Sequence, residues 1–269
     1  QRRQLARHLS TSVERTCVRF RRMIAGEATF DQGSESLSKC YSFFCLCRLA
    51  VLDAETIPAA DLSTLAQQIT TLSLWRGDRP DHPLWLWRDY AVEVVGDGFG
   101  TWRQYISMDP PALVKKLVRS AFSHARAEPG QSDARQDRAT DALVSIAVQE
   151  PQLVLQLVSD EALSTPAVDS HAPYGSNVAA VDLLQKMIVR KPAAMLEVLD
   201  DIARIIVSTM SPALPALRKS CLDASKRAIA AMTEAYPMVS FHRTTQRLAV
   251  GLVNSSIAIF DLNSARRLL

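Results

Sequence analysis

Hydrophobic positions recur with the period of an amphipathic helix over most of the chain, and prolines divide this pattern into segments. A helical segment ends just before a proline, and a second amphipathic helix begins at that proline. Proline suits the first turn of a helix, where its missing N–H would have no partner, and it disfavours helical backbone in the preceding residue. Each such proline therefore predicts the boundary between the two helices of a pair.

Three of the predicted second helices align with one another. They read PALVKKLV from Pro111, PQLVLQLV from Pro151 and PAAMLEVL from Pro192, at steps of 40 and 41 residues. This step lies within the range of HEAT and armadillo repeats. We therefore predict an all-α solenoid of helix pairs over residues 1–237, with a single globular helical bundle as the alternative.

The remaining helices follow from apolar stripes at helical spacing. Two first helices are predicted from the stripes Ala139, Ala142, Leu143, Ile146, Ala147 and Val181, Leu184, Met187, Ile188. Other helices are predicted over 37–52, from Pro58, over 91–106 (weakened by Gly96, Gly98 and Gly100), over 196–210 and over 217–236. Residues 75–90 read as an insertion, and the polar stretches 124–138 and 164–176 read as surface connections.

The pattern changes after Pro237. RLAVGLV and IAIFDL alternate between apolar and other residues with the period of a strand, and Asn254-Ser255-Ser256 between them is typical of a turn. We predict a β-hairpin within residues 238–269. Because an isolated hairpin is marginally stable in water, we expect it to belong to a larger sheet.

The hairpin sequence resembles the opening strands of a WD-repeat propeller blade. In such blades a small residue and a glycine end one strand, here Ala249-Val250-Gly251, and an aromatic–Asp pair closes another, here Phe260-Asp261. The turn between them has Asn254-Ser255-Ser256 in place of the usual glycine. The resemblance implies that the chain ends in an incomplete WD propeller.

The junction YPMVSFHRTTQRLAVG, where the helical repeat runs into this blade, resembles the C-terminal part of the rabconnectin-3 beta-subunit family. The resemblance covers about the last 190 residues. It implies a large cytosolic scaffold, on vesicle membranes through its partners, that works with the large rabconnectin subunit. It also implies that proton-pump subunits are partners, and that the family regulates assembly of the vacuolar proton pump and vesicle acidification.

Charge and chemistry change this picture little. Net charge is +3, but arginine is concentrated near the start, at Arg2, Arg3, Arg7, Arg15, Arg19, Arg21 and Arg22. Nucleic-acid binding through this stretch is an alternative function, although without interleaved aromatic residues a solvated helix face is favoured. The generic alternative is a helical-repeat adaptor in trafficking or nuclear transport.

Catalytic and metal-binding motifs are missing from the sequence. Cys40, Cys45 and Cys47 lie in an apolar run and read as small hydrophobic residues, and no histidine follows at ligand spacing. We therefore expect no enzyme activity, no cofactor, no metal and no small-molecule substrate. The odd cysteine count, the missing leader and the first residue, Gln1, suggest a cytoplasmic fragment without a transmembrane segment.

One cluster of aromatic and arginine residues is a candidate partner interface, because these residue types dominate protein interfaces. Its members are Trp75, Arg76, Trp85, Trp87, Arg88 and Tyr90. The alternative is that Trp85 and Trp87 cap a hydrophobic layer between helices, since tryptophan buries a large area wherever it lies.

Overall fold

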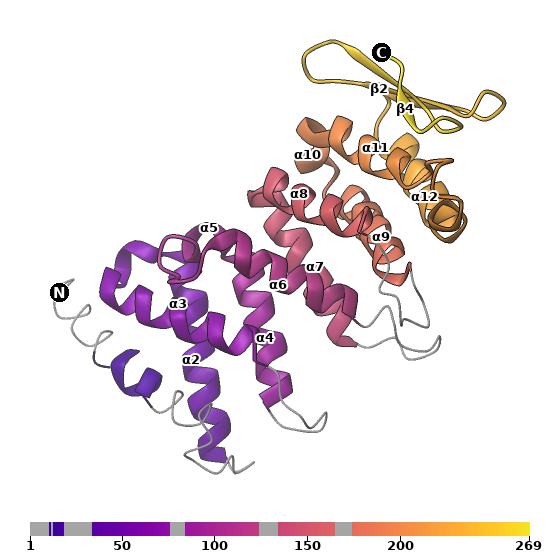
Figure 1. Ribbon diagram of the computed structural model, residues 1–269. Coiled ribbons are helices and arrows are strands. Elements are labelled where there is room, and N and C mark those ends of the chain that lie inside the picture. The colour runs from indigo at the N-terminus through magenta and orange to yellow at the C-terminus, as the bar shows by residue number, and fades with distance from the viewer. Residues whose placement is uncertain (1–10, 12, 19–33, 76–83, 124–133, 165–173) are drawn as a thin grey trace. The chain divides into compact units, whose positions relative to one another are not determined.

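A computed structural model describes residues 11, 13–18, 34–75, 84–123, 134–164 and 174–269 (Figure 1). Helices dominate these residues, and a small antiparallel sheet follows them at the C-terminal end. The prediction of a mostly helical chain is confirmed. The chain divides into two compact units, Gln1–Leu117 and Val118–Leu269, and the sheet lies in the second unit with the last helices. The predicted division after residue 237 stays a prediction.

The first unit is built on packed helices that follow the expected proline boundary. Helix α3 begins directly after Pro58, which occupies the N-cap position, as predicted. Helices α2 and α3 both pack against α4, and α2 also contacts α5. The elements are α2 (Ser34–Leu52), a 3-10 turn (Ala54–Thr56), α3 (Ala59–Ser73), α4 (Leu84–Asp97), α5 (Phe99–Trp102) and the start of α6 (Pro110–Ser123).

Gly98 separates α4 from α5 at a point of close packing. A Cβ atom there would collide with the Val51 side chain and would lie 2.6 Å from Nε1 of Trp102. That indole nitrogen donates a hydrogen bond to the Val94 carbonyl at 3.1 Å. The predicted weakness around the glycines is thus confirmed as a helix break. The predicted start of this helix at residue 91 was wrong, because residues 84–90 are its first turns and not part of an insertion.

Helices of the second unit begin at proline in three places. Pro151, Pro192 and Pro215 occupy the first turns of α8, α10 and α12. The connection predicted over 124–138 was wrong at its end, because α7 already begins at Ala134, and residues 124–133 lie outside the described part. The helices are α7 (Ala134–Gln149), α8 (Pro151–Ala162), α9 (Gly175–Arg190), α10 (Pro192–Met195), a 3-10 turn (Leu196–Val198), α11 (Leu199–Ser208) and α12 (Pro215–Ala235).

The core of this unit lies between successive helices. Helix α7 packs on α8 and α9, α9 packs on α8 and α12, and α11 contacts α8, α9 and α12. The predicted first-helix stripes are buried throughout. The helix predicted over 196–210 begins as a 3-10 turn over Leu196–Val198 and continues as α11 only to Ser208, but its apolar residues from Val198 to Ile206 are buried as expected.

The C-terminal residues form a four-stranded antiparallel sheet in the order β1-β2-β3-β4. The strands are β1 (Val239–His242), β2 (Arg247–Gly251), β3 (Ile257–Asp261) and β4 (Arg266–Arg267). The predicted strands correspond to β2 and β3. The predicted two-stranded hairpin was too small, because β1 and β4 each add a short strand at an edge of the sheet.

The first and last turns of the sheet have the same pattern of side-chain hydrogen bonds and backbone angles. In the first turn, His242 Nδ1 is hydrogen-bonded to Thr245 Oγ1 at 2.8 Å. In the last turn, Ser264 Oγ donates to Asp261 Oδ2 at 2.6 Å, so each turn bonds a side chain to the hydroxyl three residues later. The residue after each hydroxyl has a positive φ, 55° at Gln246 and 53° at Ala265. Glycine is usual at such positions. The Ser264 hydroxyl, as the largest influence, lowers the pKa of Asp261.

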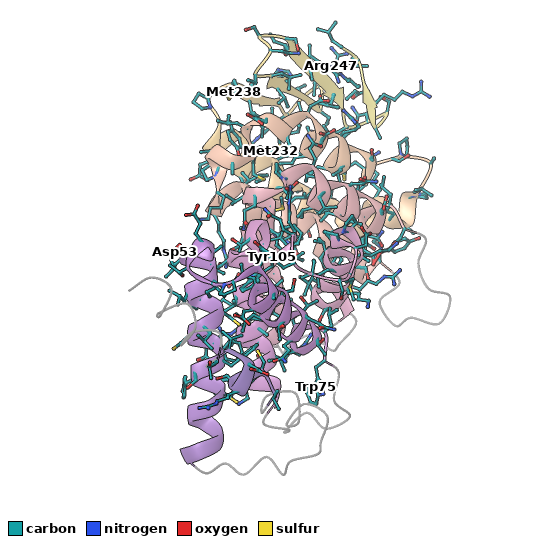
Figure 2. The ribbon with its side chains drawn as sticks, turned by 90° about the vertical axis from the view of Figure 1, so that its left-hand side faces the viewer. Asp53, Trp75, Tyr105, Met232, Met238 and Arg247 are labelled. Atoms are coloured by element: carbon teal, nitrogen blue, oxygen red, sulfur yellow. The ribbon has the colours of Figure 1, made fainter. Side chains whose placement is uncertain are left out.

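One face of the sheet packs on α11 and α12. That face is buried and consists of Val239, Leu248, Val250, Ala258 and Phe260. Arg267 Nη1 donates to Asp200 Oδ2 on α11 at 3.0 Å, and its guanidinium lies 6.0 Å from the centre of the Phe260 ring. Figure 2 shows Met232 on α12 and, in the sheet region, Met238 and Arg247, which mark the two ends of the β1–β2 hairpin.

Candidate interaction surfaces

The residues predicted as a partner interface differ widely in exposure. Trp75 is half-buried just after α3, Trp87 and Arg88 are buried on α4, and Tyr90 on the same helix is 36% exposed. Arg76 and the side chain of Trp85 lie outside the described residues. Of the side chains described, Trp75 and Tyr90 therefore remain accessible to a partner.

Trp87 lies at the centre of an aromatic cluster between α2 and α4. Its ring stacks on Phe44 at 5.7 Å with an interplanar angle of 16°. Tyr41 meets it edge-on at 5.3 Å, and Tyr90 lies 6.0 Å away. Such pairs add about 0.5–1.5 kcal/mol each beyond the burial of their area. Trp87 is thus part of the core of the first unit, while Tyr41, 58% exposed, lies at its surface.

Arginine side chains tie the same helices together. The buried Arg88 donates from Nε to the Ser73 carbonyl at 3.3 Å, which joins α4 to the end of α3. Arg48 on α2 donates to Glu93 at 2.5 Å and to Asp97 at 2.6 Å on α4. These three side chains are roughly 40% exposed, so each pair contributes at most about 1 kcal/mol. Arg88 and Arg48 therefore stabilise the unit itself.

Metal-ligating and basic side chains are the next candidates for a site among the described residues. No group of three or more His, Cys, Asp or Glu side chains among them could hold a metal ion. His242 is described, at the end of β1, whereas His8, His82, His124 and His171 lie outside the described part. Arg15 is exposed, but the other arginines of the basic start also lie outside it.

The cysteines separate into buried and exposed thiols. Cys17, Cys40, Cys47 and Cys221 are buried. The prediction of small hydrophobic residues is confirmed for Cys40 and Cys47 but was wrong for Cys45 on α2, which is exposed. Burial raises the pKa of Cys40 to about 12, and burial together with Asp182 raises the pKa of Cys221 to about 11. Burial also raises the pKa of Cys47, with a further contribution from Cys17. A raised pKa keeps a thiol protonated and unreactive.

We therefore expect iodoacetamide at pH 8 to modify Cys45 well before the other four cysteines of the folded protein. The thiolate is the form that reacts, and the reagent must reach it. Cys45 is exposed, whereas the other four cysteines are buried. Peptide mass spectrometry over time measures this order. Cys45→Ser should remove the fast reaction, and equal labelling of all five thiols would contradict the described core.

Two of the grooves on the second unit border helix α12. The first, of about 790 Å³, runs along α9 towards α12 and contains Phe122, Val178, Lys186 and Val189. Ion pairs cross it or flank it, from Arg227 to Asp182 at 2.7 Å and from Arg190 to Asp141. Each of these two pairs joins neighbouring helices, so Arg227, Asp182 and Arg190 already have partners within the unit.

The second groove, of about 590 Å³, lies between α12 and the edge strand β1. Helix α12 contributes side chains at helical spacing along one face, and β1 contributes Val239, Ser240 and Phe241. The sequence analysis missed this groove because it depends on β1, which was not predicted. The alternation VSFH, with a buried Val239 and an exposed Ser240, is the signal that could have revealed that strand.

None of the helices in the described ranges combines the length and the apolar character needed to cross a membrane. Comparison of the chain with protein families, with curated proteins and with solved structures finds no match.

Proposed function

We propose that this chain is a non-catalytic protein–protein scaffold belonging to a rabconnectin-3-like regulator of vacuolar proton-pump assembly. The observation that carries the proposal is the C-terminal sheet. It contains the two segments that resemble a WD blade, RLAVG in β2 and IAIFD in β3, within a four-stranded antiparallel meander. Propeller blades are sheets of four strands.

The outer face of the sheet supports the blade interpretation. Ser240, Ala249 and Ile259 lie opposite one another across β1, β2 and β3, on the face away from the helices. An antiparallel sheet that faces water on one side usually carries polar side chains there. The outer face here carries a polar row, His242, Arg247 and Asp261, beside the row that contains Ala249 and Ile259. Ala249 and Ile259 suit contact with a second sheet, which packs at about 10 Å. A neighbouring blade would supply that sheet.

The helical part supports the scaffold interpretation. Helices that are first in their pairs, α7, α9 and α12, contact one another in succession, and the second helices α8 and α11 are also in contact. Nearest-neighbour packing of this kind is typical of helical repeats, which present long surfaces to protein partners. We extend this arrangement to a HEAT- or armadillo-like solenoid, and the pump-regulating role follows from the resemblance alone.

Affinity purification of the tagged protein from cells tests the proposal. We expect the large rabconnectin subunit and proton-pump subunits to be enriched over a tag-only control. The variant Ile259→Asp, which places a charge on the outer sheet face, should lose partners that need the propeller, whereas Val253→Asp in a turn, where Val253 is 70% exposed, should not. Recovery of coat or transport proteins without pump subunits would favour the generic adaptor instead.

A further inference from the structure

The groove between α12 and β1 combines an apolar wall with a free strand edge. The helix side includes the apolar residues Leu222, Ile229 and Ala230. Leu222 and Ile229 are two turns apart on one face of α12, and Ala230 belongs to the adjacent row, four residues after Lys226. The strand side is β1, which has β2 as its neighbour and no strand on its other side within the described sheet. A groove bordered by a helix and a sheet edge is the site type that binds extended peptides as an added strand.

The hydrogen-bonding groups on that edge can be identified from the register. Gly251 N donates to Met238 O at 2.9 Å, so Met238 and Gly251 form a hydrogen-bonded pair. Such pairs alternate along an antiparallel ladder, which means that Ser240 and His242 bond to β2 while Val239 and Phe241 face away from it. The Val239 N–H already donates to Tyr236 O at 3.0 Å. The Val239 carbonyl and both backbone groups of Phe241 therefore point to the open edge.

The charge of the groove indicates what kind of peptide fits. Lys226 and Arg243 line it, and no acidic side chain does. Lys226 also lies 3.4 Å from Asp223, an exposed residue on the rim. The strand β1 runs back along α12, because Arg218 near the start of α12 donates to the Asn263 carbonyl at 3.5 Å and Asn263 Nδ2 donates to the Thr245 carbonyl in the β1–β2 turn. Lys226 lies two helical turns before Thr233 and Arg243 follows the end of β1, so both cations lie at the groove end away from Met238.

We propose that this groove binds an extended segment of a partner protein as a fifth strand antiparallel to β1, with an acidic residue near the segment's start and apolar residues after it. The acidic side chain meets Lys226 and Arg243, the apolar side chains pack between Ile229 and Phe241, and Phe241 exchanges two backbone hydrogen bonds with the residue opposite. The strand β1 rises about 3.4 Å per residue, so the segment needs about five residues. This inference does not depend on the proposed role in proton-pump assembly.

Fluorescence anisotropy with the full chain and a labelled Glu-Asp-Val-Thr-Ile-Thr peptide tests the proposal. We expect saturable binding that the double variant Lys226→Glu/Arg243→Glu weakens by about tenfold, since two exposed charge pairs contribute about 1–2 kcal/mol together. Lys219→Glu is the matched control, because Lys219 is exposed on α12 but does not line the groove. It should change the affinity by less than about twofold. Circular dichroism confirms that each variant is folded.

Two altered peptides separate strand addition from simple charge attraction. Methylation of the valine amide nitrogen removes a donor that the Phe241 carbonyl needs, so this peptide should bind much more weakly. A peptide with lysine in both acidic positions should not bind. The proposal is overturned if no peptide binds, if the acidic and basic peptides bind equally, or if the methylated peptide binds as tightly as the parent.

Discussion

Replacing Trp87 with alanine is expected to lower the free energy of unfolding of the first unit by about 3–5 kcal/mol. The side chain is 2% exposed and stacks on Phe44 at 5.7 Å, so its removal leaves a cavity between α2 and α4 as well as losing the aromatic contacts. Urea unfolding followed by far-ultraviolet circular dichroism measures the change. The sequence-based interface hypothesis expects the opposite, weaker partner binding with unchanged helicity.

Tyr41→Ala is the matched control, because Tyr41 belongs to the same cluster but is 58% exposed. Its edge-on contact with Trp87 contributes about 1 kcal/mol, and the expected loss of stability is of that size or less. If both variants were equally stable and Trp87→Ala reduced partner capture, Trp87 would be an interface residue and its place in the core would be refuted.

Phe260→Ala is expected to have an effect of similar size in the second unit, about 3–5 kcal/mol. Phe260 is 1% exposed at the centre of the sheet face that packs on the helices, where it lies opposite Leu248 on β2 and Arg267 on β4. Its removal takes away the largest fully buried side chain of the sheet. Amide hydrogen exchange should show lost protection in β2 and β3, and urea unfolding gives the change in free energy.

Ile257→Ala provides the comparison within the same strand, since Ile257 is 55% exposed. We expect a change below about 1 kcal/mol and no change in exchange of the β2 amides. An unaltered exchange pattern in Phe260→Ala would mean that the sheet is not held to the helices through this face, which would contradict the packing described above.

Local signals explain how much of the fold could be predicted. Pro151 and Pro192 predict helix starts because the fixed backbone geometry of proline suits the first turn. The spacing of apolar residues, as in α9, predicts which face of a helix is buried. Glycine destabilises the interior of any helix, so a break near Gly98 could be predicted from the sequence. These features depend on neighbours within a few residues.

The missed features depend on contacts between distant residues. The strand β4 has two residues, both arginine, and forms because they pair with Phe260 and Asp261. Residues 84–90 read as part of an insertion because the step from Pro58 to Pro111 is 53 residues, longer than the later steps of 40 and 41. In the structure, packing on α2 buries Trp87 and the segment is helical. The edge groove likewise required both α12 and β1, which no single stretch of sequence displays.

We propose that the chain acts as a scaffold in the assembly of the vacuolar proton pump. The most direct test is the share of assembled pump on vesicle membranes in cells that lack the protein, measured by membrane sedimentation and immunoblotting of pump subunits. The proposed function predicts that this share falls and that restoring the protein with Phe260→Ala fails to recover it, while restoring the unaltered protein or Ile257→Ala succeeds. An unchanged share of assembled pump in the absence of the protein would contradict it.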